Sequence, residues 1–303
     1  MMTNDTQLVH KTVLLKESID GLGIHEGDVY LDGTLGSAGH ALYALEQTKG
    51  NLKVIGLDRD TEALARSSQR LSAYKDVNLV ESSYKDLEEV LNRLNISKIN
   101  RFMLDLGLSS DQFETSGRGF TFKNDEPLLM TFKKDLKPED LTAAKIVNTW
   151  AEESIADIIY GFGEERYSRR IARAIVNYRE KKEIEKTGEL VEIINQAVPF
   201  FYKKGKIHPA TRTFQALRIA VNDELNTLKI GLSKGFEKLD SGGRMAIISF
   251  HSLEDRIVKN FNKEKEEAGL AKIITKKPIV PGDDEISQNP RSRSAKLRIL
   301  EKI

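Results

Sequence analysis

The chain has 303 residues, 39% of them hydrophobic, which is enough for one substantial core and a second, smaller unit. It contains no cysteine, which excludes disulfides and thiolate metal sites and is compatible with a reducing cytoplasm. No segment approaches the roughly 18 apolar residues of a membrane span, and the first residues do not read as a signal peptide. We therefore expect a cytoplasmic protein with no membrane partner.

The net charge of +1 hides an asymmetry along the chain. From Phe201 onward there are 21 Lys and Arg against 13 Asp and Glu, whereas the first 200 residues hold 26 against 33. Any surface that contacts a phosphate backbone should therefore come largely from the C-terminal third. A solvated, lysine-rich surface without a partner is the alternative.

Apolar runs and helix-like patterns alternate through the first half of the chain and resume near its end. We predict strands at 29–32, 54–58, 78–80, 102–106 and 245–250, and helices at 41–48, 61–74 and 84–94. This alternation predicts an α/β fold with a doubly wound, mostly parallel sheet.

The segment 138–206 interrupts this alternation. It is charged and helix-periodic, with helices predicted at 143–148, 152–160, 167–180 and 188–197. We expect residues 1–137 and 207–303 to form one α/β domain, with 138–206 as an inserted helical domain. After the insertion, one long helix is predicted over 211–239, ending at Gly242-Gly243, and two strands over 271–279 and 295–303 could pair as a terminal hairpin.

A glycine-rich turn follows the first predicted strand in VYLDGTLGSAGH, residues 29–40. Glycines let the backbone turn tightly and bring N–H groups close to a ligand at a helix N-terminus. The spacing is G-x-x-G-x-x-G, which differs from the G-x-G-x-x-G of nicotinamide-binding folds. A purely structural turn is the alternative.

Asp58 ends the next strand and lies 19 residues beyond Gly39. A carboxylate at this point of a doubly wound fold can accept hydrogen bonds from the hydroxyls of an adenosine ribose. It could instead cap the following helix, although Asp60 or Thr61 could take that role. The turn and Asp58 together favour a nucleoside cofactor but do not choose between NAD and S-adenosylmethionine.

Asp105 ends a later strand, at the edge where open α/β sheets place ligands and chemistry. A polar loop follows it, with Ser109, Ser110 and Gln112 able to contact cofactor and substrate. Arg118 and Phe120 then offer a cation and a ring, a pairing that suits a nucleotide, although Phe120 could merely pack against the sheet.

Several long motifs in this sequence resemble the RsmH/MraW family of bacterial methyltransferases. They include LDGTLGSAGH, DLGLSSDQ with RGFTF, GEERYSRRIARAI, HPATRTFQALRIAVNDEL, SFHSLEDR and NPRSRSAKLRI, in order along nearly the whole chain. The resemblance implies a Rossmann-like class I methyltransferase that uses S-adenosylmethionine to methylate the exocyclic N4 of a cytidine in the decoding region of 16S ribosomal RNA, within the small ribosomal subunit.

The resemblance also implies the cofactor contacts, whereas the candidate proton acceptors follow from the chemistry of methyl transfer and the candidate RNA contacts from the charged and aromatic residues themselves. The cofactor contacts carried over are Ala38, Gly39, His40, Asp58, Tyr84, Asp105 and Gln112. The candidate proton acceptors are Asp105, Ser109 and Ser110, followed by His251 and Asp255, and a structural role at a strand end is the alternative for His251. The candidate RNA contacts are Arg118, Phe120, Arg212, Arg218, Arg291, Arg293, Lys296 and Arg298. We expect no obligatory metal, and the sequence leaves a homodimer open.

Two segments depart from the family pattern. The family has G-G-H where this chain has Ala38-Gly39-His40, and P-L-D-M-R-M-D where this chain has PLLMTFK at 127–133. The second change removes two acids and an arginine. A ribosome-binding relative without catalysis is therefore one alternative, and a nicotinamide-dependent oxidoreductase is the other.

Overall fold

The computed structural model describes residues 11–107 and 116–303 and divides the chain into two compact units. The first unit comprises Met1–Gly107 and Leu225–Ile303, and the second comprises Leu108–Glu224. The helical segment that the sequence predicts over 138–206 lies inside the second unit, which begins earlier and ends later than that prediction.

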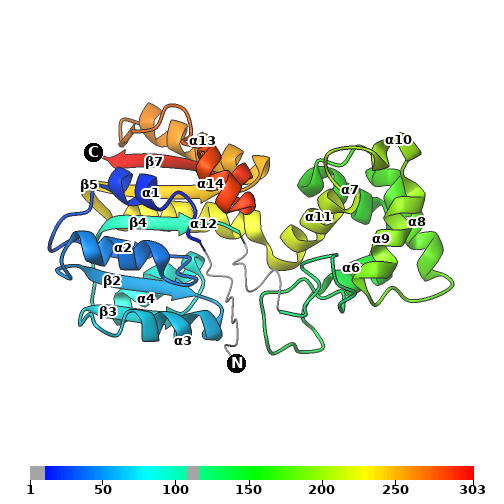
Figure 1. The fold of residues 1–303 in the computed structure, drawn as a ribbon, viewed down its shortest axis with the longest axis horizontal. Helices are drawn as coiled ribbons and strands as arrows, with labels where there is room; N and C mark the ends of the chain where they lie inside the picture. Colours follow the sequence, from blue (N-terminus) through cyan, green and yellow to red (C-terminus); the bar gives the residue numbers. More distant parts are fainter. Residues whose placement is uncertain (1–10, 108–115) are drawn as a thin grey trace, which may run out of the picture. The chain divides into compact units, whose positions relative to one another are not determined.

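A seven-stranded sheet in the order β3-β2-β1-β4-β5-β7-β6 forms the first unit (Figure 1). Its strands are β1 (Val29–Asp32), β2 (Lys53–Asp58), β3 (Val77–Glu81), β4 (Ile99–Asp105), β5 (Leu239–Ser249), β6 (Ala271–Ile273) and β7 (Lys296–Lys302). The first five strands pair in parallel, and β7 runs antiparallel to both β5 and β6. The predicted doubly wound, mostly parallel sheet is confirmed.

Helices cover both faces of this sheet. They are α1 (Leu15–Leu22), α2 (Gly39–Gln47), α3 (Thr61–Arg70), α4 (Leu87–Arg93), α12 (Glu224–Lys238), α13 (Ser252–Glu267) and α14 (Asp283–Gln288), with 3-10 turns η1 (Tyr84–Asp86) and η2 (Pro290–Ser294). Tyr30 packs with residues of α1 and α2, whereas its neighbour Leu31 packs with residues of α4, α12 and α13. Because both faces are buried, the central strands read as continuous apolar runs.

The order of the last strands distinguishes this fold from the dinucleotide-binding fold that a nicotinamide-dependent oxidoreductase would have. The dinucleotide-binding order is 3-2-1-4-5-6, whereas here the antiparallel β7 lies between β5 and β6. The predicted pairing of the two terminal strands is confirmed, although β6 ends at Ile273 and only Ile279 returns to bridge Leu297.

The second unit is helical around its own apolar core. Its helices are α6 (Ala143–Thr149), α7 (Glu152–Gly163), α8 (Ser168–Arg179), α9 (Thr187–Ala197), α10 (Phe200–Lys203) and α11 (Ala210–Asn222). Phe120, Leu128 and Met130 pack into the same core. Within the described ranges, no helix combines the length and the apolar character that a membrane crossing requires.

The prediction of one continuous helix over 211–239 is wrong. Asp223 adopts the left-handed conformation with φ of 50° and separates α11 from α12. The side chain of Asn222 explains the break, because its Nδ2 donates to the carbonyl of Met130 at 2.8 Å and its Oδ1 accepts from the N–H of Phe132 at 2.9 Å. In addition, β5 begins at Leu239, before Gly242-Gly243 rather than after it.

A buried ion pair joins α13 to β7. Arg298, 8% exposed, donates to both carboxylate oxygens of Asp255, at 2.7 and 3.3 Å, and Lys296 donates to the same carboxylate at 3.2 Å. Burial raises the pKa of Asp255, but hydrogen bonds from Arg298 and Lys296 outweigh it, so this pKa lies below its ordinary value. Asp255 therefore stays ionised in the folded protein.

Replacing Asp255 by asparagine should lower the free energy of unfolding by about 3 kcal/mol at neutral pH, because Arg298 stays buried without its carboxylate. Since the folded pKa of Asp255 is depressed, the wild type loses this contribution only as the pH falls below about 4. Urea denaturation of both proteins at several pH values measures the difference. Lys296→Met, which keeps the Arg298 pair, is the control, and equal losses in the two variants would contradict the assignment.

Candidate cofactor and catalytic site

Three aspartates lie at the carboxyl edge of the sheet, where β1, β2 and β4 end. Asp32 stands beside Gly56 of β2 and Met103 of β4 in the parallel register, so Asp58 and Asp105 each lie two residues further along neighbouring strands. Open α/β sheets bind ligands at this edge. The structure thus brings together two predicted residues and Asp32, which the sequence did not single out.

The turn between β1 and α2 has a constrained backbone. Gly36 and Ala38 have φ of 52° and 58°, and Gly39 opens α2. A Cβ added at Gly39 would lie 1.8 Å from Oγ1 of Thr12, so only glycine fits there. Ala38 holds the left-handed conformation that the family gives to glycine, which costs on the order of 1 kcal/mol.

Asp58 is oriented by this turn. Its Oδ2 accepts the N–H of Gly36 at 2.8 Å, and its Oδ1 accepts the N–H of Asp60 at 2.9 Å. Burial raises the pKa of Asp58, and these backbone bonds oppose the rise. Asp60 itself caps α3 by accepting the N–H groups of Glu62 and Ala63, so Asp58 is not the cap. The backbone of Arg59 also bonds to the Asp58 carboxylate, which keeps acceptor capacity for one ligand hydroxyl.

His40 and Asp105 face one another. His40 is 4% exposed, and its Nε2 lies 3.1 Å from the carbonyl of Val13, which can only accept, so Nε2 carries the proton. Its Nδ1 lies 4.0 Å from Oδ2 of Asp105. The other oxygen of Asp105, Oδ1, is buried, and no hydrogen-bond partner for it exists in the part of the chain that the structure describes.

The segment that holds His40 is anchored by the C-terminal part of the chain. Glu285 of α14 accepts the N–H of Leu14 at 2.9 Å, and Asn289 donates to the carbonyl of Lys11 at 3.0 Å. Leu14 is left-handed, with φ of 47°. These bonds fix the carbonyl of Val13 that orients His40.

Asp32 is the most buried of the three aspartates, at 1% exposure. Its carboxylate accepts the hydroxyl of Tyr30 and the N–H of Thr34, both at 3.1 Å. Burial raises its pKa to about 7, despite these bonds.

The pKa of Asp105 is raised well above its ordinary value, first by burial and then by the charges of Asp32, Glu254 and Glu285. A cluster of buried and half-buried acids of this kind disfavours further negative charge and favours a cationic ligand or a proton. Strongly shifted acids at the ligand edge of a sheet mark a functional site.

Tyr84 lies in η1, next to the same edge. A Cβ added at Gly231 of α12 would lie 2.4 Å from Cδ2 of Tyr84, so the missing side chain lets the ring pack directly against this helix. The ring is held in place, and its stacking on adenine stays a prediction.

A model of the MraW methylase family matches residues 7–303. The chain belongs to this family. Proteins named ribosomal RNA small subunit methyltransferase H are similar to it: one from Sulfurihydrogenibium sp. is 47% identical over 97% of this chain and 99% of the relative, and one from Coprothermobacter proteolyticus is 44% identical over 99% and 98%. A solved rRNA methylase from Streptococcus thermophilus matches 97% of this chain and 98% of its own at 13% identity, with a TM-score of 0.46.

His251, a candidate acceptor in this MraW family protein, caps a helix. Its Nδ1 accepts the N–H of Glu254 at 3.4 Å, and the Glu254 carboxylate accepts the N–H groups of Phe250 and His251 at 2.8 and 3.3 Å. This reciprocal arrangement is a capping box at the start of α13. The capping role accounts for the position of His251, and a catalytic role stays a prediction.

The candidate RNA contacts in the helical unit are largely engaged inside it. Phe120 is 5% exposed and stacks on Phe132 at 5.6 Å, so it is a core ring rather than a free platform for a base. Arg118 donates to the carbonyl of Phe132 at 2.8 Å. Arg218 forms two hydrogen bonds with Glu224, at 2.8 and 2.9 Å.

The four basic residues near the C-terminus, which the sequence shows as one cluster, have two different environments. Arg291 and Arg293 of η2 are exposed, whereas Arg298 is buried against Asp255 and Lys296 donates to the same carboxylate. The buried Arg298 is therefore not placed to contact a phosphate.

Three predicted site residues, Ser109, Ser110 and Gln112, lie outside the described residues. Sequence reasoning missed Asp32, which the strand-terminal position shared with Asp58 and Asp105 could have indicated. It also missed Thr34, whose hydroxyl accepts the N–H of Asp105 at 2.6 Å. A polar residue just beyond a strand gives no local signal of such a long-range bond.

Replacing Gly39 by alanine should destabilise the MraW fold by about 1–3 kcal/mol and weaken binding of S-adenosylmethionine, the expected cofactor, because the turn must move away from Thr12. Thr12→Gly removes the clashing side chain and should restore both quantities in the double variant. Thermal unfolding and calorimetric titration complete the double-mutant cycle. If the effects of Gly39→Ala and Thr12→Gly on stability and affinity simply add in the double variant, the contact between residues 39 and 12 is not their cause.

Asp32→Asn should reveal the raised pKa of this carboxyl. Between the ordinary value of 3.8 and about 7, folded Asp32 keeps a proton that the unfolded chain has lost. The wild type should therefore lose stability relative to the neutral variant as the pH rises through this window, by about 1.4 kcal/mol for each pKa unit. Urea denaturation between pH 4 and pH 8 measures this, with the exposed Asp76→Asn as control. If the difference in the free energy of unfolding between the wild type and Asp32→Asn stays constant from pH 4 to pH 8, the pKa of Asp32 is not raised.

Proposed function

We propose that this protein transfers the methyl group of S-adenosylmethionine to the exocyclic N4 of a cytidine in the decoding region of 16S ribosomal RNA, in the cytoplasm. The observation that carries the proposal is the 47% identity, over 97% of the chain, with a protein named ribosomal RNA small subunit methyltransferase H. Membership of a methylase family and the acid-lined edge of the sheet support it.

The residues at the sheet edge fit this cofactor. Asp58 has acceptor capacity for a ribose hydroxyl, the 36–39 turn leads into the N-terminus of α2, and Tyr84 offers an aromatic ring for the adenine. The buried Asp32 and the half-buried Asp105 favour a positive charge nearby. S-adenosylmethionine supplies a methyl group bound to a sulfonium, which carries such a charge.

Asp105 is our candidate for the proton acceptor. Methyl transfer is an in-line displacement, so the protein must hold the amino nitrogen in line with the donor, and an acceptor on its N–H sharpens the nucleophile. The buried Oδ1 of Asp105 is an acceptor available for that N–H, and the raised pKa makes the carboxylate a stronger base once ionised. Ser109 and Ser110 remain proposals for the same task.

The helical unit is our candidate for substrate recognition. A base inside an RNA helix is out of reach of the sheet edge, so the target cytidine must be unstacked before it reacts. Holding RNA in that form requires contacts beyond the base itself. The helical unit has an apolar core of its own and exposed basic residues on its helices, which suits this task.

A ribosome-binding relative without catalysis is the second candidate, motivated by Leu129 and Thr131. The altered segment is nevertheless firmly held: Leu128 and Met130 are buried in the helical core, and the N–H of Ala143 donates to the carbonyl of Leu129 at 3.0 Å. The departures therefore leave an ordered segment, and the methylation assay decides between the two candidates.

The decisive measurement incubates the protein with labelled S-adenosylmethionine and small ribosomal subunits from a strain that lacks this gene. Mass spectrometry of the nucleosides should find a cytidine methylated at N4. Unmodified cytidine, with subunits bound, would establish the non-catalytic candidate instead.

Two variants separate cofactor binding from chemistry. Asp105→Asn should lower kcat by about 10²–10⁴, the range of general acid–base catalysis, with little change in cofactor affinity. Asp58→Ala should weaken the cofactor about tenfold, since it removes hydrogen bonds to the ribose, while α3 keeps its cap on Asp60. An Asp105→Asn enzyme with the kcat of the wild type would remove Asp105 from the chemistry.

A further inference from the structure

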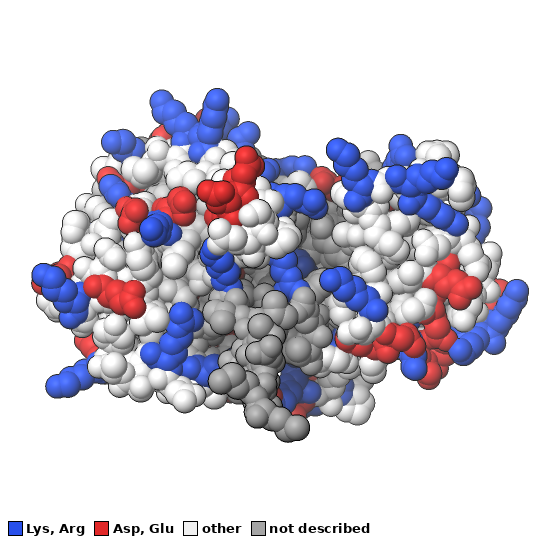
Figure 2. Space-filling model, viewed as in Figure 1, with Lys and Arg blue, Asp and Glu red and all other residues white. Residues whose placement is uncertain are grey.

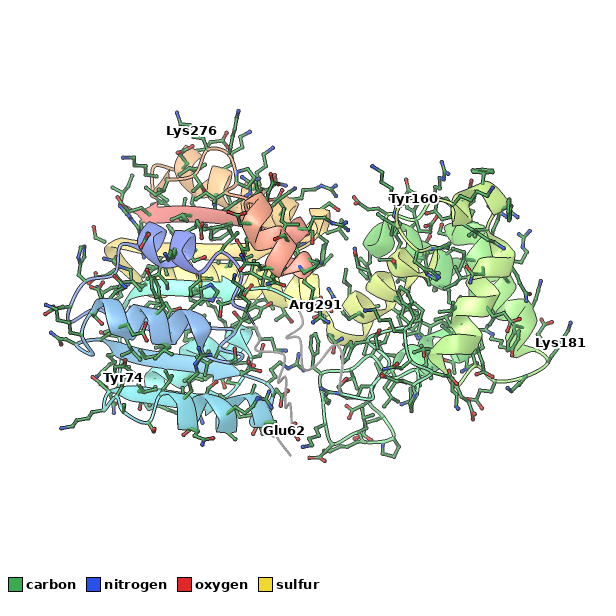
Figure 3. All side chains as sticks on the ribbon, viewed as in Figure 1. Glu62, Tyr74, Tyr160, Lys181, Lys276 and Arg291 are labelled. Atoms are coloured by element: carbon green, nitrogen blue, oxygen red, sulfur yellow. The ribbon has the colours of Figure 1, made fainter. Side chains whose placement is uncertain are left out.

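Exposed aromatic rings gather on the helical unit, on residues that the site described above does not use. Phe200 and Phe201 of α10 are 70% and 65% exposed, and Tyr160 at the end of α7 is 67% exposed. Figure 3 labels Tyr160 at the outer edge of this unit. An exposed apolar patch, unlike a single exposed side chain, marks an interaction site, and Phe200 and Phe201 are adjacent in the chain.

Cationic side chains lie over two aromatic rings of α10 and over the ring of Tyr167. The guanidinium of Arg166 lies 4.9 Å from the ring centroid of Tyr167 and 5.2 Å from that of Tyr202, and the ammonium of Lys204 lies 4.8 Å from that of Phe200. We call these residues, together with Arg170, Phe201, Lys203 and Lys206, the α10 face. Its cationic groups remain exposed to solvent.

A buried carboxylate fixes the α10 face. Glu165, fully buried, accepts the N–H of Tyr167 at 2.8 Å and the hydroxyl of Tyr202. The rings of Tyr167 and Tyr202 meet edge to face at 5.0 Å, and Arg212 donates to the Tyr202 hydroxyl at 3.4 Å. The short helix α10 is thus tied to the start of α8 and to α11, so its exposed rings are presented on a rigid support.

The charge of this region is strongly positive. Segments 164–173 and 199–212 together hold eight Lys and Arg against two Glu, and one of these acids is the buried Glu165. Figure 2 shows Lys and Arg gathered over the part of the helical unit where Figure 1 places α7 and α10. The complementary partner is a polyanion.

We infer that the α10 face binds a single-stranded segment of ribosomal RNA. Phe200 and Phe201 stack on unpaired bases, while the surrounding Lys and Arg neutralise phosphates, a combination typical of single-strand recognition. Duplex RNA hides its bases from such rings. A second copy of the chain fits poorly, because a twofold interface would press this cationic face against itself. The inference rests on the proposed rRNA substrate and adds where that substrate is held.

Two surface variants test the inference. Phe200→Ser with Phe201→Ser should weaken binding on the order of tenfold at every salt concentration, because stacking is lost. Lys203→Gln, Lys204→Gln and Lys206→Gln together should reduce the slope of log affinity against log salt by about 2, because three phosphate contacts are lost. Filter binding to undermethylated small subunits and to a single-stranded RNA oligomer measures both, and the KM for subunits should rise with the affinity for S-adenosylmethionine unchanged.

Matched controls separate these effects from general damage. Leu270→Ser removes an exposed apolar side chain, 49% exposed, from the other unit, and Lys181→Gln removes an exposed cation elsewhere on the helical unit. Both should bind like the wild type. If the α10 face variants also bind subunits and single-stranded RNA as tightly as the wild type, the inference is overturned.

The remaining outcomes are also decisive. Loss of a dimer in the α10 face variants, with RNA affinity intact, would make the face a contact between copies and overturn the inference. RNA binding through this face without methylation of cytidine would support the inference and reject the proposed function. Methylation of cytidine with an unchanged KM for subunits in both variants would support the proposed function and overturn the inference.

Discussion

The parallel register of β1, β2 and β4 is the constraint on which the site depends, because it ends three strands in aspartates at one edge of a buried sheet. A single turn satisfies most of these groups: Asp32 accepts the N–H of Thr34, Asp58 accepts that of Gly36, and the hydroxyl of Thr34 accepts the N–H of Asp105. The left-handed residues of the turn are therefore a consequence of bringing two backbone donors and one hydroxyl acceptor to three strand ends at once.

This arrangement leaves one acceptor without a partner among the described residues, the buried Oδ1 of Asp105. A buried acceptor that meets no donor costs about 1–3 kcal/mol relative to a satisfied one. A ligand that brings an N–H to this oxygen recovers that energy, and the amino group of cytidine is such a donor. Burial also raises the pKa of Asp105. Burial therefore accounts both for the cost of an acceptor without a donor and for the tendency of this carboxylate to take a proton.

Features with a local or periodic signal could be predicted from the sequence. The central strands were predictable because both of their faces are buried, and Asp60 was readable as a cap because it directly precedes α3. The break at Asp223 was not, because it depends on Asn222 bonding to a segment some 90 residues earlier. Arg298 likewise looked like part of a basic cluster, since nothing near it in the sequence indicates its partner.

The basic residues show why position in the fold decides which charges can meet a polyanion. β7 lies between β5 and β6, and its buried cation Arg298 is held by the carboxylate of Asp255. Lys203 and Lys204 lie at the end of a short surface helix whose neighbouring residues include no acid from 199 to 212, so their charges stay exposed to solvent. Equal charges in the sequence thus separate into those that are held by carboxylates inside the sheet domain and those that stay exposed to solvent.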